Sequence, residues 1–227
     1  MIDTLLFDLD NTLLDFDKAE ANAITRALGD VGISVTDEMR DCYHKINLAQ
    51  WKLLEQGKMT REEVKMRRFK LLFQEFDIKA SLQEVAKHYQ DYLGQGHYFI
   101  EGAEEVLQEL SKRFRIYLVT NGTLSVQKGR LESSGIKKYL QGVFISEEVG
   151  YNKPSKEYFN YCFSHIPDFK KENTAIIGDS LSSDIQGGKN AGIKTIWFHR
   201  QQDQTEKIGP KPDYEIRSLK SLLDVLQ

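Results

Sequence analysis

The pattern of apolar positions divides the chain into three parts. Residues 2–7 form a short apolar run rich in β-favouring residues, which predicts a buried strand. From about residue 17 to about residue 96 the apolar positions recur with helical spacing. The helices predicted in this stretch span residues 17–31, 36–55, 60–76 and 81–93.

Local start and stop signals support these helices. Thr60 and Ser81 are each followed by a glutamate three residues later, which is the spacing of a capping box. Thr36 lacks this glutamate and predicts only a partial cap. Gly32 and Gly57 lie where the first two helices should end, since glycine readily adopts the left-handed conformation that closes a helix.

From residue 101 onward, helical segments alternate with short apolar runs. The predicted helices span residues 102–112, 124–134, 156–164, 184–191 and 219–226. The predicted strands span residues 115–120, 142–146, 174–178, 194–198 and 213–216. Such alternation is typical of a parallel α/β sheet with helices on both faces.

The helical block separates the first strand from the rest of this pattern. The simplest architecture is a doubly wound α/β core, residues 1–15 and 98–227, with an all-α domain inserted at residues 16–97. The hinges should lie near residues 14–16 and 95–100.

Composition excludes several classes of protein. The chain has 227 residues and a formal net charge of −3, which gives no electrostatic basis for binding a nucleic acid polymer. No apolar run approaches the roughly 18–20 residues of a membrane span, and no signal peptide is visible. Cys42 and Cys162 lack CxxC spacing and resemble thiols of a reducing compartment. We therefore expect a cytoplasmic protein without a membrane partner, and the sequence leaves open whether it is a monomer or a homodimer.

Polar residues collect where the predicted strands end. Asp8 and Asp10 follow the first strand directly, and ligands of open parallel sheets bind at the carboxyl ends of the strands. Later strands are also followed by groups suited to phosphate or metal. These are Thr120-Asn121-Gly122, Lys153-Pro154, Gly178-Asp179-Ser180 and Asp184.

The segment with Asp8 and Asp10 is the first of four such segments, and the one from Gly178 to Asp184 is the last. In their order and positions, the four segments resemble the motifs of the haloacid dehalogenase-like (HAD) superfamily. The resemblance covers nearly the whole core and implies a Rossmann-like α/β domain. The inserted helices resemble the cap domain of one large branch of this superfamily. Residues 145–159 and 178–197 are most similar to nucleotidase-type members, which act on pyrimidine nucleotides.

The residues suit a phosphoryl transfer. A carboxylate can attack phosphorus and form an aspartyl-phosphate, and Asp8 is the candidate nucleophile. Asp10 would give a proton to the leaving alkoxide and later take one from water. Mg²⁺ favours a site with few carboxylates, waters and a substrate phosphate. Asp8 and Asp179 would supply side-chain ligands, and Asp184 would bind directly or through water; the resemblance adds the backbone carbonyl of Asp10.

Further residues would bind the substrate. The Thr120 hydroxyl and the backbone N–H groups of Asn121 and Gly122 would hold the phosphoryl oxygens, and Lys153 would neutralise charge. Asp15 and Phe16 adjoin the first hinge and are candidates for substrate contact. Four aromatic residues of the insert offer stacking surfaces, although their helical spacing favours the interior. They are Tyr43, Trp51, Phe69 and Phe73.

The resemblance implies a Mg²⁺-dependent phosphomonoester hydrolase acting on a small soluble phosphate, with a nucleoside 5'-monophosphate as the leading substrate. A sugar phosphomutase shares all four motifs, and a sugar-phosphate or phosphoglycolate phosphatase is a further alternative. A metal-independent 2-haloacid dehalogenase typically lacks the second aspartate, so Asp10 and Asp179 argue against it. A non-catalytic binding protein would not need Asp8, Asp10, Thr120, Lys153 and Asp179 together.

Overall fold

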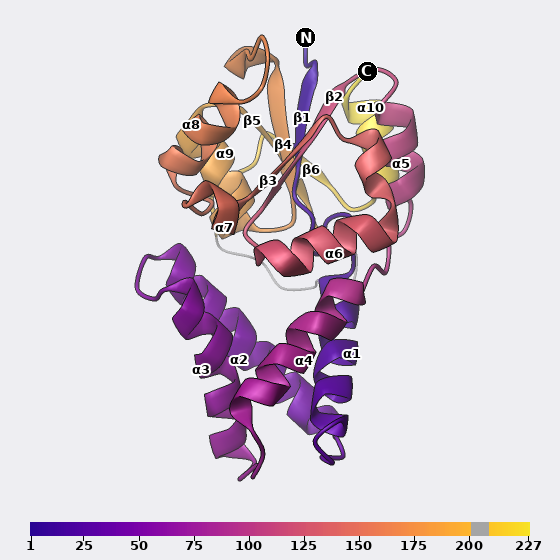
Figure 1. Cartoon of the computed structure of the whole chain (residues 1–227). Helices are drawn as coiled ribbons and strands as arrows, with labels where there is room; N and C mark the ends of the chain where they lie inside the picture. The colour runs from indigo at the N-terminus through magenta and orange to yellow at the C-terminus, as the bar shows by residue number, and fades with distance from the viewer. Residues whose placement is uncertain (201–208) are drawn as a thin grey trace.

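The computed structural model describes residues 1–200 and 209–227. Among these residues six parallel strands form one sheet in the order β3-β2-β1-β4-β5-β6 (Figure 1). The strands are β1 (Thr4–Phe7), β2 (Arg115–Thr120), β3 (Gly142–Ile145), β4 (Thr174–Gly178), β5 (Lys194–Phe198) and β6 (Tyr214–Ile216). The predicted parallel α/β sheet is confirmed.

The strand order places the first strand at the centre of the sheet. The chain adds β2 and β3 on one side of β1 and then β4, β5 and β6 on the other, so the direction of winding reverses between β1 and β4. Phe7 is in register with Leu118 of β2 and Ile177 of β4. The residues that follow these three positions therefore emerge at one edge, where ligands of such sheets bind.

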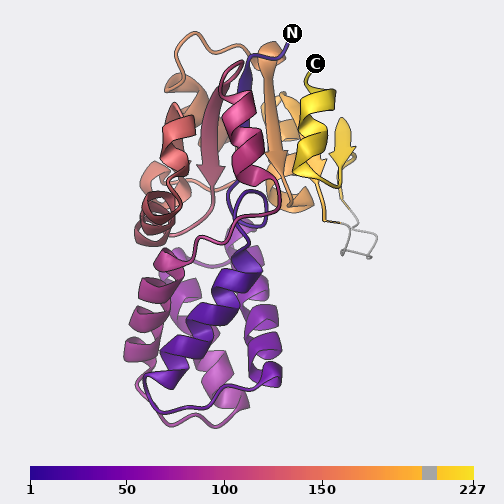
Figure 2. The ribbon, with the colours of Figure 1, turned by 90° about the vertical axis from the view of Figure 1, so that its right-hand side faces the viewer.

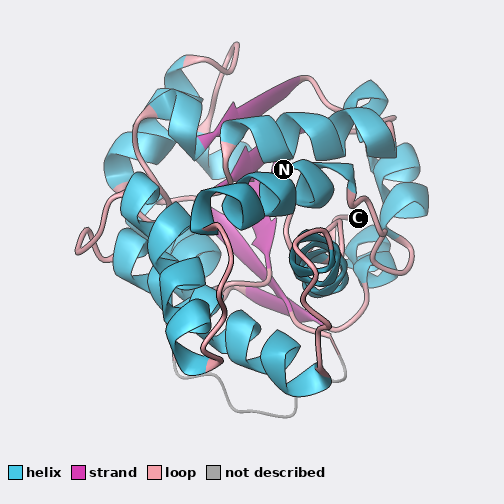
Figure 3. Ribbon diagram, turned by 60° about the horizontal axis from the view of Figure 1, so that its bottom comes forward, coloured by secondary structure: helices cyan, strands magenta, loops and turns pink. Residues whose placement is uncertain are grey.

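Helices cover both faces of the sheet (Figure 3). Leu5 and Phe7 pack into a cluster with helices on one face, whereas Leu6 belongs to a cluster on the opposite face. The helices of the first face are α5 (Ala103–Leu110), α6 (Leu124–Ser134) and α10 (Leu222–Val225). Those of the second face are α8 (Lys156–Ser164) and α9 (Gln186–Ala191).

Four further helices, which we call the four-helix segment, lie beyond the carboxyl ends of the strands (Figures 1 and 2). They are α1 (Phe16–Gly29), α2 (Asp37–Glu55), α3 (Arg61–Glu75) and α4 (Leu82–Gln95). The segment has its own apolar core, in which the rings of Tyr43, Phe69 and Tyr89 lie 5.3–5.4 Å apart, centroid to centroid.

The capping box predicted at Thr60 is complete, whereas at Ser81 only the hydroxyl half of the predicted box forms. Glu63 completes the capping box by accepting from the backbone N–H of Thr60 at 2.8 Å, while the Thr60 hydroxyl accepts from the backbone of Glu63. The hydroxyls of Thr36 and Ser81 each accept one backbone N–H. Gly32 has a φ angle of 80°, in the left-handed region that closes a helix.

Two chain crossings join the four-helix segment to the sheet, and they lie side by side. The backbone N–H of Asp15 donates to the carbonyl of Tyr98 at 2.7 Å, and that of Ile100 donates to Leu13 at 3.0 Å. This paired connection lies next to the carboxyl end of β1.

The structure differs from the predicted elements in short segments. A turn of helix, α7 (Ser146–Val149), begins at the last residue of the predicted strand 142–146 and continues where no element was predicted. A π-helical turn, η3 (Leu181–Ile185), precedes α9. Three short 3₁₀ turns complete the described elements: η1 (Ile136–Tyr139), η2 (Lys171–Asn173) and η4 (Leu219–Ser221). Within the described ranges, no helix combines the length and the apolar character that crossing a membrane requires.

Candidate active site

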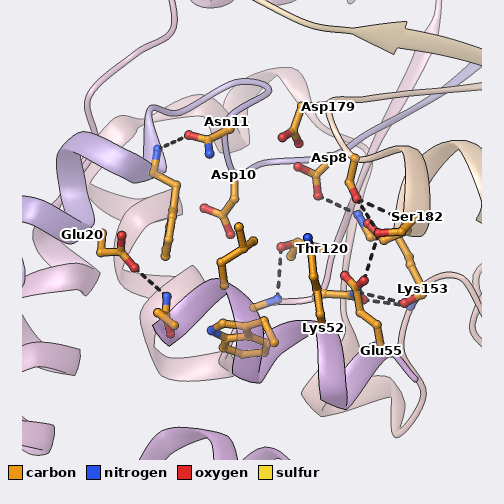
Figure 4. A pocket seen from close by; sticks show the side chains of 18 of the residues that line it. Asp8, Asp10, Asn11, Glu20, Lys52, Glu55, Thr120, Lys153, Asp179 and Ser182 are labelled. Carbon is orange, nitrogen blue, oxygen red and sulfur yellow. Dashed lines mark hydrogen bonds and ion pairs between the residues drawn. The ribbon is translucent and has the colours of Figure 1, made fainter. Parts of the chain in front are cut away.

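Three carboxylates meet at the carboxyl ends of β1 and β4. Asp8 follows β1, Asp179 follows β4, and Asp184 lies in the π-helical turn. One oxygen of each lies within 4.8 Å of the others. Asp8 is 6% exposed and Asp184 is 1% exposed, so two of these charges are buried. The structure thus brings together the three residues whose side chains were proposed from the sequence as metal ligands. Figure 4 shows two of them, Asp8 and Asp179, facing each other.

Lys153 bridges two of these carboxylates. Its Nζ atom lies 2.6 Å from Asp8 Oδ1, 2.6 Å from Asp184 Oδ1 and 2.8 Å from the carbonyl oxygen of Val119. An ammonium group has three protons, and these contacts use all of them. Lys153 therefore neutralises the buried acids in this arrangement, and reaching a bound phosphate would require it to exchange one contact.

The charges of the cluster are unbalanced. Burial raises the pKa of Asp8 to about 7; the carboxylates of Asp184 and Asp10 act in the same direction and the Lys153 ammonium opposes them. Burial opposes the charge of Lys153, yet the carboxylates of Asp184 and Asp8 raise its pKa. Three carboxylates face one ammonium, and all donors are oxygens of the kind that a hard divalent cation prefers. The residues present therefore fit Mg²⁺.

A glycine allows this close packing at the end of β4. A methyl group at Gly178 would collide with the carboxylate of Asp184. That carboxylate also accepts the backbone N–H of Ser180 at 3.1 Å through its second oxygen. Gly178 therefore lets Asp184 lie against the strand end and reach Lys153.

The loop after β2 contributes a hydroxyl group and a side chain that binds the loop carrying Lys153. The Thr120 hydroxyl is buried and accepts from the Gln127 amide at 2.8 Å and from the backbone N–H of Gly122 at 3.3 Å. The Asn121 side chain exchanges two hydrogen bonds with the backbone of Lys153, at 2.8 and 3.0 Å. Asn121 thereby ties the loop after β2 to the loop that carries the lysine.

Asp10 lies beside this cluster, and helix α6 holds it. Gln127 Nε2 donates to Asp10 Oδ2 at 2.7 Å, and the guanidinium of Arg130 forms an ion pair with Oδ1. The side chain of Asp10 is 28% exposed and faces the cavity (Figure 4). Asp10 thus combines a fixed orientation with access to a ligand.

A cavity of about 660 Å³ extends from the acids to the four-helix segment. Phe16 and Trp51 line it, as the sequence suggested for Phe16. Asp15 is not among its lining residues; its carboxylate caps α1 by accepting from the backbone of Lys18 at 2.9 Å and pairs with Arg200 at 3.1 Å. The other three aromatic candidates of the insert lie in the apolar cluster of the four-helix segment: Tyr43, Phe69 and Phe73.

The far wall of the cavity carries a chain of polar contacts. Asn47 donates to Glu20 Oε1 at 2.6 Å and accepts from Arg68 at 2.9 Å, and His44 Nδ1 lies 2.7 Å from Glu20 Oε2. Arg68 is 3% exposed, and its Nε atom has no hydrogen-bond partner among the described residues. The four-helix segment therefore offers this end of the cavity both charge and hydrogen-bonding groups.

One arginine joins the four-helix segment to the loops at the strand ends. The guanidinium of Arg61 donates to the carbonyls of Asn121 and Gly122 at 2.9 and 3.1 Å. It also reaches Ser146 Oγ at 2.7 Å and Asn152 Oδ1 at 2.6 Å. Arg61 thus holds the first turn of α3 against two loops that border the acids.

Sequence reasoning missed the polar residues that helices bring to the cavity. Gln127 and Arg130 share one face of α6, and Glu20, Asn47 and Arg68 are buried in the four-helix segment. The sequence offered one indication of such residues, a polar residue at a position where helical spacing predicts the interior. This pattern indicates that the side chain is buried, but it does not show which residue the side chain contacts.

Comparison with known proteins identifies relatives of this chain. The family described as haloacid dehalogenase-like hydrolase matches residues 5–198. The chain is 43% identical to the HAD-hydrolase YfnB of Bacillus subtilis over 98% of this chain and 94% of that protein. It is 42% identical to the pyrimidine 5'-nucleotidase PynA of Streptococcus pneumoniae, again over 98% and 94%. The crystal structure of YfnB bound to magnesium, which reveals interdomain movement, matches with a TM-score of 0.92 at 42% identity, covering 100% of this chain and 99% of that one.

Proposed function

This chain belongs to the haloacid dehalogenase-like hydrolases, and on that basis we propose that it is a Mg²⁺-dependent nucleoside 5'-monophosphate phosphatase. The observation that carries the proposal is the buried cluster of Asp8, Asp179, Asp184 and Lys153 with Asp10 beside it. Nucleophile, proton carrier and charge-neutralising groups thus border one cavity.

In the first step the carboxylate of Asp8 attacks the phosphorus atom of the substrate. A bond forms between phosphorus and the Asp8 oxygen, and the bond between phosphorus and the nucleoside 5'-oxygen breaks. Asp10 gives its proton to that leaving oxygen, because an alkoxide is a poor leaving group without one. The Thr120 hydroxyl and the backbone N–H groups of Asn121 and Gly122 orient the phosphoryl oxygens.

In the second step water attacks the aspartyl-phosphate while Asp10, now ionised, takes a proton from that water. Inorganic phosphate leaves and the carboxylate of Asp8 is restored. Mg²⁺, when bound, would offset the negative charge of the phosphate and of the nucleophile. Asp8 and Asp179 would hold it with their side chains, Asp184 directly or through water, and Asp10 through its backbone carbonyl.

The cavity wall supports a nucleotide as substrate. Trp51 and Phe16 offer aromatic surface, and Asn47, Glu20 and Arg68 offer hydrogen-bonding groups, which suits a base better than it suits a small phosphorylated acid. The likeness to the nucleotidase PynA supports a pyrimidine base. In this proposal residues 16–97 form a cap domain over a core of residues 1–15 and 98–227.

A phosphatase screen tests the proposal. Purified protein is assayed with pyrimidine and purine 5'-monophosphates, ribose 5-phosphate, glucose 1-phosphate and phosphoglycolate, with Mg²⁺ or with EDTA. We expect the highest kcat/KM for a pyrimidine nucleotide, loss of turnover in EDTA, and loss in Asp8→Asn. Preference for a sugar phosphate or phosphoglycolate would overturn the nucleotide assignment. Transfer of the phosphoryl group to a sugar hydroxyl faster than to water, or metal-independent halide release from a 2-haloacid, would overturn the phosphatase assignment.

A further inference from the structure

Arg130 is a buried cation next to the proposed site, but it does not line the cavity. Its side chain is 0% exposed, and its single ion pair among the described residues is with Asp10. An arginine buried without a partner is strongly unfavourable, so the carboxylate of Asp10 compensates a charge that would otherwise be costly. The charge of Arg130 therefore acts on Asp10 and on no other described side chain at ion-pair distance.

Arg130 and Gln127 together fix both oxygens of the Asp10 carboxylate. The guanidinium contacts Oδ1, and the Gln127 amide donates to Oδ2 at 2.7 Å and to the Thr120 hydroxyl at 2.8 Å. The two residues lie three positions apart on α6 and so share one helix face. A carboxylate held at both oxygens cannot rotate freely, which sets the direction of its remaining lone pairs.

Arg130 is itself anchored at a second point. Its Nε atom donates to the carbonyl of Gly96 at 2.8 Å, at the end of α4 where the chain returns toward the sheet. Helices α4 and α6 approach each other closely there. A methyl group at Gly129 would lie only 2.8 Å from the carbonyl oxygen of Gly94. The guanidinium thus has a fixed position from which to orient Asp10.

We propose that Arg130, with Gln127, is a positioning residue that aims Asp10 at the leaving-group oxygen. This inference rests on the proposed function, in which a proton passes from Asp10 to that oxygen and a proton from water later returns to Asp10. In this role Arg130 orients the carboxylate and does not supply the proton. It keeps the carboxylate oriented through both transfers.

The chemistry of the leaving group separates positioning from a general structural role. Departure of a nucleoside 5'-alkoxide needs the proton, whereas p-nitrophenolate departs without one. Because kcat/KM reports the steps up to the first irreversible one, it reports formation of the aspartyl-phosphate. A wrongly oriented Asp10 side chain will therefore lower kcat/KM for the nucleotide far more than for p-nitrophenyl phosphate.

The experiment measures kcat/KM for UMP and for p-nitrophenyl phosphate with Mg²⁺ in wild type, Arg130→Met, Gln127→Leu and Asp10→Asn. Glu132→Gln is the matched control, because Glu132 is exposed on the same helix. For all three site variants we expect the UMP to aryl phosphate ratio to fall by about 100-fold, and for the control we expect no change. Circular dichroism checks folding, and Gln127→Leu carries the test if Arg130→Met does not fold.

Equal losses on both substrates in Arg130→Met and Gln127→Leu, while Asp10→Asn shows the selective loss, would overturn the positioning role. Failure of the proposed function gives a different result. In that case wild type itself would hydrolyse no nucleotide, and the ratio would be measured with whichever alkyl phosphate the enzyme does hydrolyse.

Discussion

The ammonium of Lys153 lies 2.6 Å from the carboxylate of Asp8, and both side chains are almost completely buried. The same ammonium also contacts Asp184, and the carboxylate of Asp179 lies nearby. The cluster therefore has fewer positive than negative charges. Separation of charge from water makes such a deficit costly. A divalent cation would relieve it, and this connects the charge state of Asp8 to metal binding.

We predict that the metal-free protein binds Mg²⁺ about tenfold more weakly at pH 6 than at pH 8. Burial raises the pKa of Asp8 to about 7, and only the ionised carboxylate is a ligand. The ionised fraction falls from about nine-tenths to about one-tenth across this interval. Isothermal titration calorimetry at both pH values measures the affinities, and proton uptake by the buffer at pH 6 reports the ionisation.

Asp8→Asn and Asp179→Asn provide the controls. Both variants should bind Mg²⁺ weakly, but only Asp8→Asn should lose the difference between pH 6 and pH 8. Equal wild-type affinities at the two pH values would show that Asp8 is ionised throughout this range.

The strand-end residues could be predicted because one rule of parallel sheets decides their position. Strands running in one direction deliver the residues that follow them to the same edge, and the register of Phe7 with Leu118 and Ile177 does this here. Asp8 and Asp179 therefore converge irrespective of the details of packing. Capping signals were equally local, and the Thr60 box formed as expected because all its partners lie within one turn.

The contacts made by helices could not be predicted in the same way. Spacing places Gln127 and Arg130 on one face of α6, but their partner Asp10 is 117 to 120 residues away and depends on how the helix packs. Arg61 begins a helix and has the sequence context of an ordinary exposed first-turn residue. Its contacts with Asn121 and Asn152 follow from the angle at which the four-helix segment meets the sheet.

We predict that Arg61→Ala loosens the four-helix segment from the loops at the strand ends. The guanidinium makes four hydrogen bonds across this contact, and hydrogen bonds of charged groups contribute about 1.5–3 kcal/mol each when well formed. A net loss of about 2 kcal/mol would shift the balance between the docked and separated arrangements about 30-fold. Small-angle scattering should show a larger radius of gyration, and KM for the substrate should rise.

Arg67→Ala is the matched control for Arg61→Ala. Arg67 lies on the same helix, is exposed and has no hydrogen bond or ion pair among the described residues. An unchanged scattering profile and KM in Arg61→Ala would mean that apolar packing alone holds the segment in place.

We predict that Asn47→Ala destabilises the protein by about 3 kcal/mol. Asn47 donates to Glu20 and accepts from Arg68, so its removal leaves two buried charged groups with one fewer partner each. Urea denaturation measures the loss. Lys45→Ala, an exposed change on the same helix, should shift the unfolding free energy by less than about 0.5 kcal/mol. A loss equal to that of Lys45→Ala would show that water replaces the Asn47 amide at no cost.

We predict that Gly178→Ala lowers Mg²⁺ affinity and turnover together although residue 178 itself offers no ligand. The added methyl group would occupy the space of the Asp184 carboxylate and displace it from Lys153. Gly29→Ala is the control, because a methyl group at the end of α1 meets no atom within 4 Å and should leave activity unchanged. Calorimetric titration with Mg²⁺ and a phosphatase assay measure both effects. Wild-type affinity and turnover in Gly178→Ala would show that Asp184 need not lie against the strand end for the site to work.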